Sequence, residues 1–291
     1  MLDARCPTPD TRPPTPGPRS AFTLIELLVV ISVISLLVGI LAPTLSSARA
    51  QARQVVCTSN LRQLTLASVM YTNAANGALP PCGWNESGGA VYWWGKVLAD
   101  RVDHTASPLY KYLRTCLAPD SVYECPDQPW GTYKPQPVRL KEQVTSTYGY
   151  NGYYLTPAAT PGWSSTIRKR PWQRLETIPA PGKVFMFADT LIYYMQDKMP
   201  CNNALLDPPF LYQGSSERSA RDATGSGSNS WRANGNPTTA FRHRGLTAAA
   251  CCDGHVDLFT PEGGTITAPA FHIGSVGATN GPHYVPDWQS W

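Results

Sequence analysis

Four side chains near the C-terminus are of types that bind metal ions in proteins. They are His243, Asp253, His255 and Asp257. Imidazole nitrogens and carboxylate oxygens are ordinary metal ligands. The same side chains also have a structural explanation, because Asp253 and Gly254 fit a tight turn and His255 fits a half-exposed strand. The sequence therefore leaves a metal site and a structural role open for these four residues.

A β-hairpin is the element that would position this group. The Asp-Gly dipeptide within residues 247–259 favours a tight two-residue turn between two strands. Such a turn places Cys252 opposite His255 and Cys251 opposite Val256. Because side chains alternate along a strand, the two adjacent cysteines are expected to point to opposite faces.

Cysteines are the second group with chemical potential. The eight of them are Cys6, Cys57, Cys82, Cys116, Cys125, Cys201, Cys251 and Cys252. This number favours a body outside the cytoplasm, where disulfides form. Cys116 and Cys125 are nine positions apart, and a disulfide between them would stabilise the fold by roughly 3 kcal/mol. We predict that disulfide, with a zinc site as the rival interpretation, although neither cysteine has the CxxC spacing of a zinc motif.

Motifs for catalysis are missing from the sequence. It contains no nucleophile elbow, phosphate-binding loop or zinc-protease helix. We therefore expect no enzyme, and no cofactor apart from a metal ion at the four residues near the C-terminus. The net charge of +4 is small for 291 residues, and no dense run of Lys and Arg is interleaved with aromatic residues. Nucleic acid is therefore not an expected partner.

An apolar stretch at residues 22–42 indicates a membrane-spanning helix. Its 21 residues are enough to cross a bilayer, which takes about 20. Arg5, Arg12 and Arg19 precede it, so the positive-inside rule predicts a cytoplasmic N-terminus and a body on the far side. The stretch runs on into Pro43 and further helix-forming sequence, without the small-residue cleavage site that ends a secretory signal. We therefore predict a single-pass membrane protein.

Glu26 is the exception within this apolar stretch. An ionised carboxylate inside a membrane-spanning helix costs on the order of 2.5 to 3.5 kcal/mol, so its charge needs a partner. One interpretation is that Glu26 reaches the membrane surface or is protonated, since it lies near the cytoplasmic end. The other interpretation, a partner in an assembly, depends on the residues around it.

The residues around Glu26 resemble a known processing site. The string Ala-Phe-Thr-Leu-Ile-Glu at 21–26 resembles the site that prepilin peptidase cuts in type IV pilins and type II secretion pseudopilins. The resemblance implies cleavage between Ala21 and Phe22, N-methylation of Phe22, and Glu26 as the fifth mature residue. Pro43 is then the twenty-second, where family members commonly carry a helix-kinking proline. Ala21 stands where the family usually has Gly.

The same resemblance implies a function. Cleavage before Phe22 creates a charged amine that Glu26 of a neighbouring subunit can neutralise, and such a pair can set the stagger of subunits. The implied protein is a structural pilin-like subunit, assembled through its N-terminal helix into a type II secretion pseudopilus or type IV pilus-like filament. Its implied partners are prepilin peptidase, other pilin-like subunits and the inner membrane. The body would lie in the periplasm or in an extracellular filament.

The C-terminal part of the chain carries a second resemblance. Nine residues separate His243 from Asp253-Gly254, and this His-x9-Asp-Gly arrangement is similar to the C-terminal signature of large planctomycete-type prepilin-like proteins. Residues 57–64 and 181–190 are similar to stretches of the same family. Because secretion pseudopilins of this broad kind hold calcium in the C-terminal body, the resemblance implies that ion for the residues near His243.

The expected fold is α+β and pilin-like. Apolar residues at helical spacing predict that the N-terminal helix continues past Pro43 to about residue 71 and packs on a C-terminal body with antiparallel β-sheet and long loops. Within that body, residues 184–188 are predicted to form a buried strand. The expected organisation is a leader at 1–21, a transmembrane helix at 22–42, its extension at 43–76 and a globular domain at 77–291.

Two other functions are alternatives to the filament subunit. The first is a membrane-tethered module that binds polysaccharide or another polymer and uses the prepilin signal for sorting; its mark would be an exposed platform of Trp and Tyr. The second is a membrane-anchored hydrolase, which needs the histidines and aspartates near the hairpin to converge in a pocket. Only the filament subunit uses Ala21, Phe22, Glu26 and Pro43 together.

Overall fold

The structure is a computed structural model of the whole chain. It describes residues 23–98, 102–118, 120–128, 134–135, 145–157, 172–194, 199–213 and 230–290. The predicted leader, with Ala21, and the predicted first mature residue, Phe22, lie outside these residues. The chain divides into two compact units, Met1–Ala48 and Arg49–Trp291.

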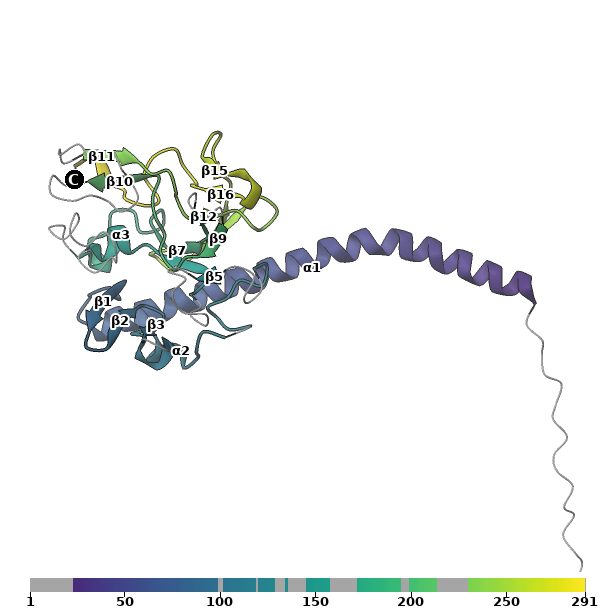
Figure 1. Cartoon of the computed structure of the whole chain (residues 1–291), viewed down its shortest axis with the longest axis horizontal. Coiled ribbons are helices and arrows are strands. Elements are labelled where there is room, and N and C mark those ends of the chain that lie inside the picture. Colours follow the sequence, from purple (N-terminus) through teal and green to yellow (C-terminus); the bar gives the residue numbers. More distant parts are fainter. Residues whose placement is uncertain are drawn as a thin grey trace, which may run out of the picture. The chain divides into compact units, whose positions relative to one another are not determined.

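One long helix, α1 (Leu24–Ala74), begins in the first unit and ends in the second. Pro43 lies inside it, so the helix continues through the proline as predicted (Figure 1). Asn76 and Gly77 follow its end with φ angles of 51° and 86°, and the Gly77 amide donates to the Thr72 carbonyl over 2.9 Å. This left-handed ending satisfies a carbonyl of the last turn and stops the helix.

The first unit contains the apolar part of α1. None of its most apolar 18-residue window is buried. The large apolar side chains exposed there are Leu24, Ile25, Leu27, Leu28, Val29, Val30, Ile31, Val33, Ile34, Leu36, Leu37, Val38, Ile40, Leu41 and Leu45. Among the described residues, α1 is the one helix that is long and apolar enough to cross a membrane.

The part of α1 in the second unit has one buried face. Cys57, Leu61 and Leu64 are fully buried and recur at the spacing of helical turns. Thr65 and Ser68 are buried on the same side, and their hydroxyls donate over 2.9 Å to the backbone carbonyls four residues earlier. Because these hydroxyls are satisfied within the helix, the face can pack against the body despite its polar residues.

A four-stranded antiparallel sheet forms the centre of the body, with the strand order β14-β13-β7-β6. The strands are β6 (Tyr148–Tyr150), β7 (Phe185–Asp189), β13 (Thr247–Cys251) and β14 (Val256–Phe259). Every residue of β6, β7 and β13 is buried. The strand β7 confirms the buried strand that the sequence predicts at 184–188.

The predicted C-terminal hairpin is present, but its register differs by one residue. Ala250 pairs with Val256, and the Cys251 amide donates to the His255 carbonyl over 2.9 Å. The loop therefore has three residues instead of two, and it closes with Gly254 at a φ of 96°. The predicted pairings of Cys251 with Val256 and of Cys252 with His255 are both wrong, because the extra loop residue shifts one strand by one position.

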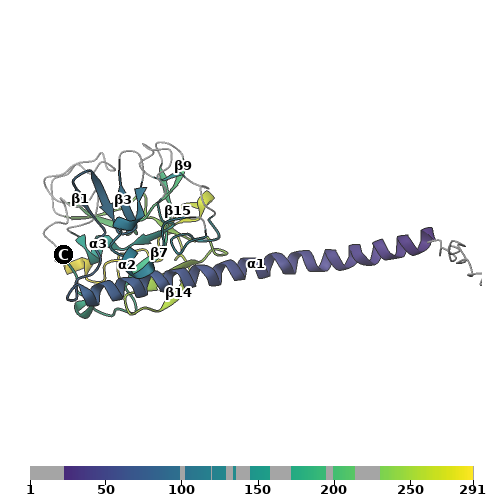
Figure 2. The same ribbon diagram turned by 90° about the horizontal axis from the view of Figure 1, so that it is seen from below.

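Smaller sheets and short helices surround the central sheet (Figures 1 and 2). One sheet contains β1 (Gly83–Glu86), β2 (Gly89–Tyr92), β3 (Gly95–Val97) and β4 (Val102–Asp103) in that order. The others are β5 (Lys134–Pro135) with β9 (Met199–Asn202) and β8 (Ile192–Tyr194), β10 (Phe210–Gln213) with β11 (Ser230–Ala233), and β12 (Thr239–Ala240) with β16 (Ile273–Gly274) and β15 (Ile266–Ala268). Single helical turns are α2 (Tyr110–Leu113), α3 (Gly152–Leu155), η1 (His104–Ala106), η3 (Leu175–Thr177), η4 (Pro269–Phe271) and η5 (Trp288–Ser290). A long helix followed by antiparallel sheets confirms the predicted α+β class.

The core of the body is rich in aromatic side chains. Its largest fully buried members are Trp93, Tyr123, Tyr148, Tyr150, Tyr153, Tyr154, Tyr284, Phe185, Phe187 and Phe241. Trp93 packs edge-on against Phe187, with ring centroids 5.1 Å apart, and its Nε1 donates to the Ala204 carbonyl over 2.9 Å. The polar atom of the largest core side chain is thus satisfied inside the fold.

Candidate functional site

A reciprocal set of hydrogen bonds closes the N-terminal end of α1. The Thr23 amide and hydroxyl both donate to Glu26 Oε2 over 2.8 Å, and the Glu26 amide donates to Thr23 Oγ1 over 3.2 Å. This arrangement is a capping box, in which each side chain satisfies a backbone amide of the other residue. Glu26 therefore helps to start the helix in the single chain, in addition to the role predicted for it in assembly.

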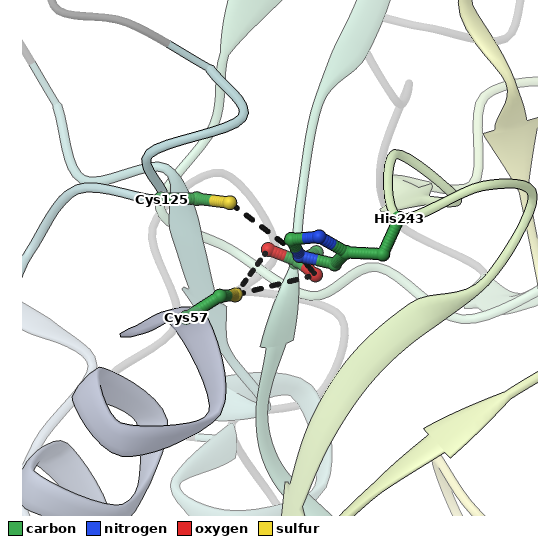
Figure 3. Close-up of side chains that lie close together, drawn as sticks. Cys57, Cys125 and His243 are labelled. Atoms are coloured by element: carbon green, nitrogen blue, oxygen red, sulfur yellow. Dashed lines mark hydrogen bonds and ion pairs between the residues drawn. The ribbon is translucent and has the colours of Figure 1, made fainter. Parts of the chain in front are cut away.

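Four buried side chains converge inside the body. They are Cys57, Cys125, Asp189 and His243, and the ligand atoms they offer all lie within 4.8 Å of one another (Figure 3). Cys57 Sγ lies 3.5 Å from Asp189 Oδ1, and Cys125 Sγ lies 3.5 Å from His243 Nε2. His243 Nε2 lies 3.1 Å from Asp189 Oδ2. Two sulfurs, one nitrogen and one carboxylate thus face a common centre, and we call these four residues the buried cluster.

Each residue of the buried cluster comes from a different element. Cys57 lies on the buried face of α1, and Asp189 is the last residue of β7. Cys125 lies in the loop between α2 and β5, where its amide donates to Thr147 Oγ1 over 2.6 Å. The Ala248 amide of the neighbouring strand β13 donates to Asp189 Oδ2 over 3.0 Å. Backbone hydrogen bonds therefore hold the loop and the carboxylate in place.

A tight turn holds the fourth residue, His243. Its amide donates to the Leu246 carbonyl over 3.0 Å, and the Leu246 amide donates back to the His243 carbonyl over 3.1 Å. Arg244 and Gly245, between them, have φ angles of 58° and 86°. Two successive positive φ angles are typical of a type I′ turn, which glycine favours. The local sequence therefore fixes the backbone that carries the imidazole.

Charged groups surround the buried cluster. His243 Nδ1 lies 2.7 Å from Asp127 Oδ2, and the guanidinium of Arg53 pairs with the same carboxyl group. Arg242 Nε lies 3.8 Å from Asp189 Oδ1. The imidazole is thus held between two carboxylates, and each carboxylate has an arginine beside it.

These contacts change the pKa values of the buried groups. Burial lowers the pKa of His243, but its hydrogen bonds to Asp189 and Cys125 outweigh that effect and raise the pKa to about 10. Burial raises the pKa of Asp189, but the charge of Arg242 and the bond to His243 outweigh it and lower that pKa. Burial raises the pKa of the Cys57 thiol. Burial also raises the pKa of Cys125, but the hydrogen bonds from Cys57 and His243 and the charge of Arg242 together outweigh it and lower that pKa. Without a bound ion, a protonated His243 therefore faces an ionised Asp189.

Two protein families match parts of the chain. Residues 18–42 match the family described as "Prokaryotic N-terminal methylation motif", and residues 46–176 match the family described as "Protein of unknown function (DUF1559)". The chain is a prepilin-like protein. No curated protein and no solved structure matches it.

The methylation-motif match of this prepilin-like protein contains the predicted processing site. Ala21 and Phe22 lie inside the match, although outside the residues that the structure describes, and Glu26 lies inside it as well. Neither match reaches His243 or Asp253, so the similarity of these two residues to a C-terminal signature stays a prediction.

The four residues that the sequence offers as candidate metal ligands lie in two places. His243 belongs to the buried cluster. Asp253, His255 and Asp257 are exposed on the C-terminal hairpin, where His255 Nδ1 lies 2.6 Å from Asp253 Oδ1. Within the described part of the chain, His243 therefore converges with two cysteines and Asp189, and not with the three hairpin residues.

The predicted disulfide between Cys116 and Cys125 is not formed in the structure. Both residues are free thiols; Cys116 is half-buried, while Cys125 Sγ points into the buried cluster and lies within 4.8 Å of Cys57 Sγ. Sequence spacing paired Cys125 with its near neighbour, whereas the fold places it beside a residue of the distant helix. No local motif marks Cys57 or Asp189; Cys57 lies inside the family match at residues 46–176, and Asp189 lies beyond it.

Proposed function

We propose that this prepilin-like protein is a structural subunit of a type II secretion pseudopilus or a type IV pilus-like filament. In this proposal, prepilin peptidase cuts the chain before Phe22 and methylates the new amine, and the subunits then assemble through α1 with other pilin-like subunits. The observation that carries the proposal is the exposed apolar surface of residues 24–45, which contains a single acidic residue, Glu26.

Before assembly, this segment spans the inner membrane once. Arg5, Arg12 and Arg19 precede it, which favours a cytoplasmic N-terminus and a periplasmic body. Moving the segment from lipid into water would cost roughly 1.5–3 kcal/mol for each fully exposed Leu, Ile or Val. A subunit can therefore leave the bilayer only if another apolar surface covers the helix, and the same segment of neighbouring subunits supplies one.

Glu26 has a second task in this proposal. A lone carboxylate in the membrane-spanning helix costs on the order of 2.5 to 3.5 kcal/mol. Pairing with the Phe22 amine of a neighbouring subunit removes that cost and favours one fixed stagger between helices. The two hydrogen bonds from Thr23 both go to Oε2, which leaves Oε1 to accept from the amine.

The N-terminal mass of the membrane-purified protein tests the processing step. The full-length gene is expressed with and without its prepilin peptidase, and intact-protein mass spectrometry identifies the first residue. We expect a chain that begins at methylated Phe22, seen only with the peptidase. A chain that keeps Met1 in both cases, or one cut after Ala42, would contradict the proposal.

Two variants separate the pairing role of Glu26 from its capping role. Glu26→Gln keeps an N3 side chain that can cap the helix but removes the charge, whereas Thr23→Ala removes the cap and keeps the charge. The loss of the charge pair should reduce cross-linked multimers in the membrane by roughly 100-fold, because 2.5 to 3.5 kcal/mol corresponds to about two orders of magnitude. We expect that loss in Glu26→Gln and only a small one in Thr23→Ala; equal losses in both would show that Glu26 serves as a cap.

The geometry gives less support to the two alternative functions. A polymer-binding module needs an exposed aromatic platform, but among the described residues Trp84 and Trp172 are the tryptophans that are exposed, while Trp93 and Trp94 are buried. A hydrolase needs accessible catalytic groups, but His243, which faces two carboxylates, is buried. The proposed role is therefore structural and not enzymatic.

A further inference from the structure

We propose that Cys57, Cys125, Asp189 and His243 form a structural zinc site in the body. The inference rests on the buried cluster and does not depend on the filament role. It also differs from the calcium site that the resemblance to pseudopilins leaves open, because two of the four donors are sulfur. Zn²⁺ takes sulfur, nitrogen and oxygen ligands in a tetrahedron, whereas Ca²⁺ takes roughly six to eight oxygens.

The spacing of the donor atoms fits a tetrahedral ion. Bonds of about 2.0–2.3 Å from zinc to oxygen, nitrogen and sulfur give tetrahedral edges of about 3.3–3.8 Å. The Cys57 Sγ to Asp189 Oδ1 and Cys125 Sγ to His243 Nε2 distances are both 3.5 Å, and His243 Nε2 lies 3.1 Å from Asp189 Oδ2. The remaining separations are within 4.8 Å, so an ion at the centre reaches all four donors after small side-chain movements.

Asp127 orients the imidazole for binding an ion. Its Oδ2 lies 2.7 Å from His243 Nδ1, so Nδ1 carries the proton of the neutral ring and the lone pair of Nε2 faces the other donors. Metal-bound histidines commonly donate their second ring nitrogen to a carboxylate in this way. Arg53 in turn pairs with Asp127. The groups that would position the ligand are therefore already in place.

The charges of the cluster balance when a divalent cation is present. Two thiolates and the carboxylate of Asp189 carry three negative charges, so a divalent ion leaves one. Arg242 compensates for it, since its Nε lies 3.8 Å from Asp189 Oδ1. The Nε and Nη1 atoms of Arg242 are buried and have no hydrogen-bond partner among the described residues, which favours a negatively charged group beside them.

A zinc ion also explains the cluster better than a disulfide does. A bond between Cys57 and Cys125 would be uncharged and would give no reason to bury Asp189 and His243 against the sulfurs. Because four protein side chains fill the coordination shell and all are buried, the site is closed and its role is structural. The ion would cross-link α1, β7 and the two loops that carry Cys125 and His243.

The test uses the untagged full-length protein, purified in detergent from cells grown with zinc. Elemental mass spectrometry should find about one zinc per chain. After removal of zinc with a chelator, Co²⁺ should bind at one equivalent and give the visible absorption of a tetrahedral cobalt–thiolate site. Peptide mapping of the same preparation, alkylated before digestion, reports whether Cys57 and Cys125 are free thiols.

Three variants connect the signal to the cluster. Cys125→Ser should abolish the cobalt–thiolate absorption or reduce it to about half, since one of two thiolates is lost. The matched control is Cys116→Ser, which changes a half-buried cysteine outside the cluster and should leave the spectrum unchanged. Asp127→Asn keeps all four ligands and should weaken metal affinity by about 10- to 100-fold.

Two results on the unmodified chain would overturn the proposal without any variant. One is a protein that contains no zinc and gives no cobalt–thiolate spectrum. The other is a Cys57–Cys125 disulfide in the protein as isolated. Retention of the full cobalt spectrum in Cys125→Ser would overturn it as well, because the metal would then be bound elsewhere.

Discussion

Asp189→Asn is the substitution that most directly tests the electrostatics of the buried cluster. The carboxylate of Asp189 is fully buried and contacts four groups: His243 Nε2 at 3.1 Å, Arg242 Nε at 3.8 Å, the Ala248 amide at 3.0 Å and Cys57 Sγ at 3.5 Å. Asparagine has nearly the same shape but no charge, so the two cations would remain buried without the anion between them. Removing one partner of a buried ion pair costs about 3–5 kcal/mol.

This loss can be converted into a melting temperature. For a folded unit of the size of Arg49–Trp291, each kcal/mol shifts Tm by about 2–4 °C, so Asp189→Asn should lower Tm by about 6–20 °C. The assay is thermal unfolding of the full-length protein in detergent, followed by tryptophan fluorescence, because most of the signal comes from the body. A chelator is present throughout, so that the loss of a bound ion does not contribute to the shift.

The matched control is Glu176→Gln, which breaks an exposed ion pair of 2.7 Å with Arg174. Exposed pairs contribute about 0–1 kcal/mol, so this variant should change Tm by no more than about 4 °C. If Asp189→Asn shifted Tm as little as the control, the argument that Asp189 holds the two buried cations would be refuted.

Three further substitutions test other parts of the fold. Burial lowers the pKa of His283 below its usual 6.5 in the folded state, so the unfolded chain binds a proton at a higher pH than the folded chain does, and stability should fall as the pH drops below about 6.5. His283→Gln should flatten that part of a Tm-against-pH curve. An unchanged slope would show that His283 does not cause the pH dependence. Gly254→Ala forces a φ of 96° on a residue with a side chain and should destabilise the hairpin by about 1–2 kcal/mol. The control is Gly235→Ala, which has equal free space for a Cβ and no left-handed φ and should be nearly neutral in the same melting assay. Trp93→Phe removes the hydrogen bond to the Ala204 carbonyl and part of a buried ring, and should cost about 1–3 kcal/mol in thermal unfolding; no change would show that the core repacks around it.

Local sequence patterns predicted the long elements of the fold. The apolar run and the spacing of Leu61 and Leu64 predict a helix that passes through Pro43, and α1 is that helix. The buried strand β7 follows from an uninterrupted apolar run. The sequence predicts the hairpin but not its register, because an Asp-Gly pair suits both a two-residue turn and the end of a three-residue loop. The pairing of Ala250 with Val256 in the structure distinguishes the two.

The buried cluster could not be assembled from local patterns. Its four residues lie on four elements, and Cys125 follows Cys57 by 68 positions (125 − 57). The sequence offers His243 as a candidate ligand but groups it with residues of the nearby hairpin, because proximity along the chain is the available guide. The packing of α1 against β7 decides which donors meet, and that packing depends on the whole core. The capping box of Thr23 and Glu26 is the opposite case, since its signature is entirely local.

The buried face of α1 has a practical consequence for anyone who wishes to study the body in solution. Cys57, Leu61 and Leu64 belong to its core, so a soluble fragment has to begin near Arg49 and keep the second half of the helix. A fragment that began at residue 77 would lack those side chains and expose the apolar surface of the body against which they pack, and we expect such a fragment to aggregate. Limited proteolysis of the full-length protein should therefore leave a resistant core whose first residues come from α1.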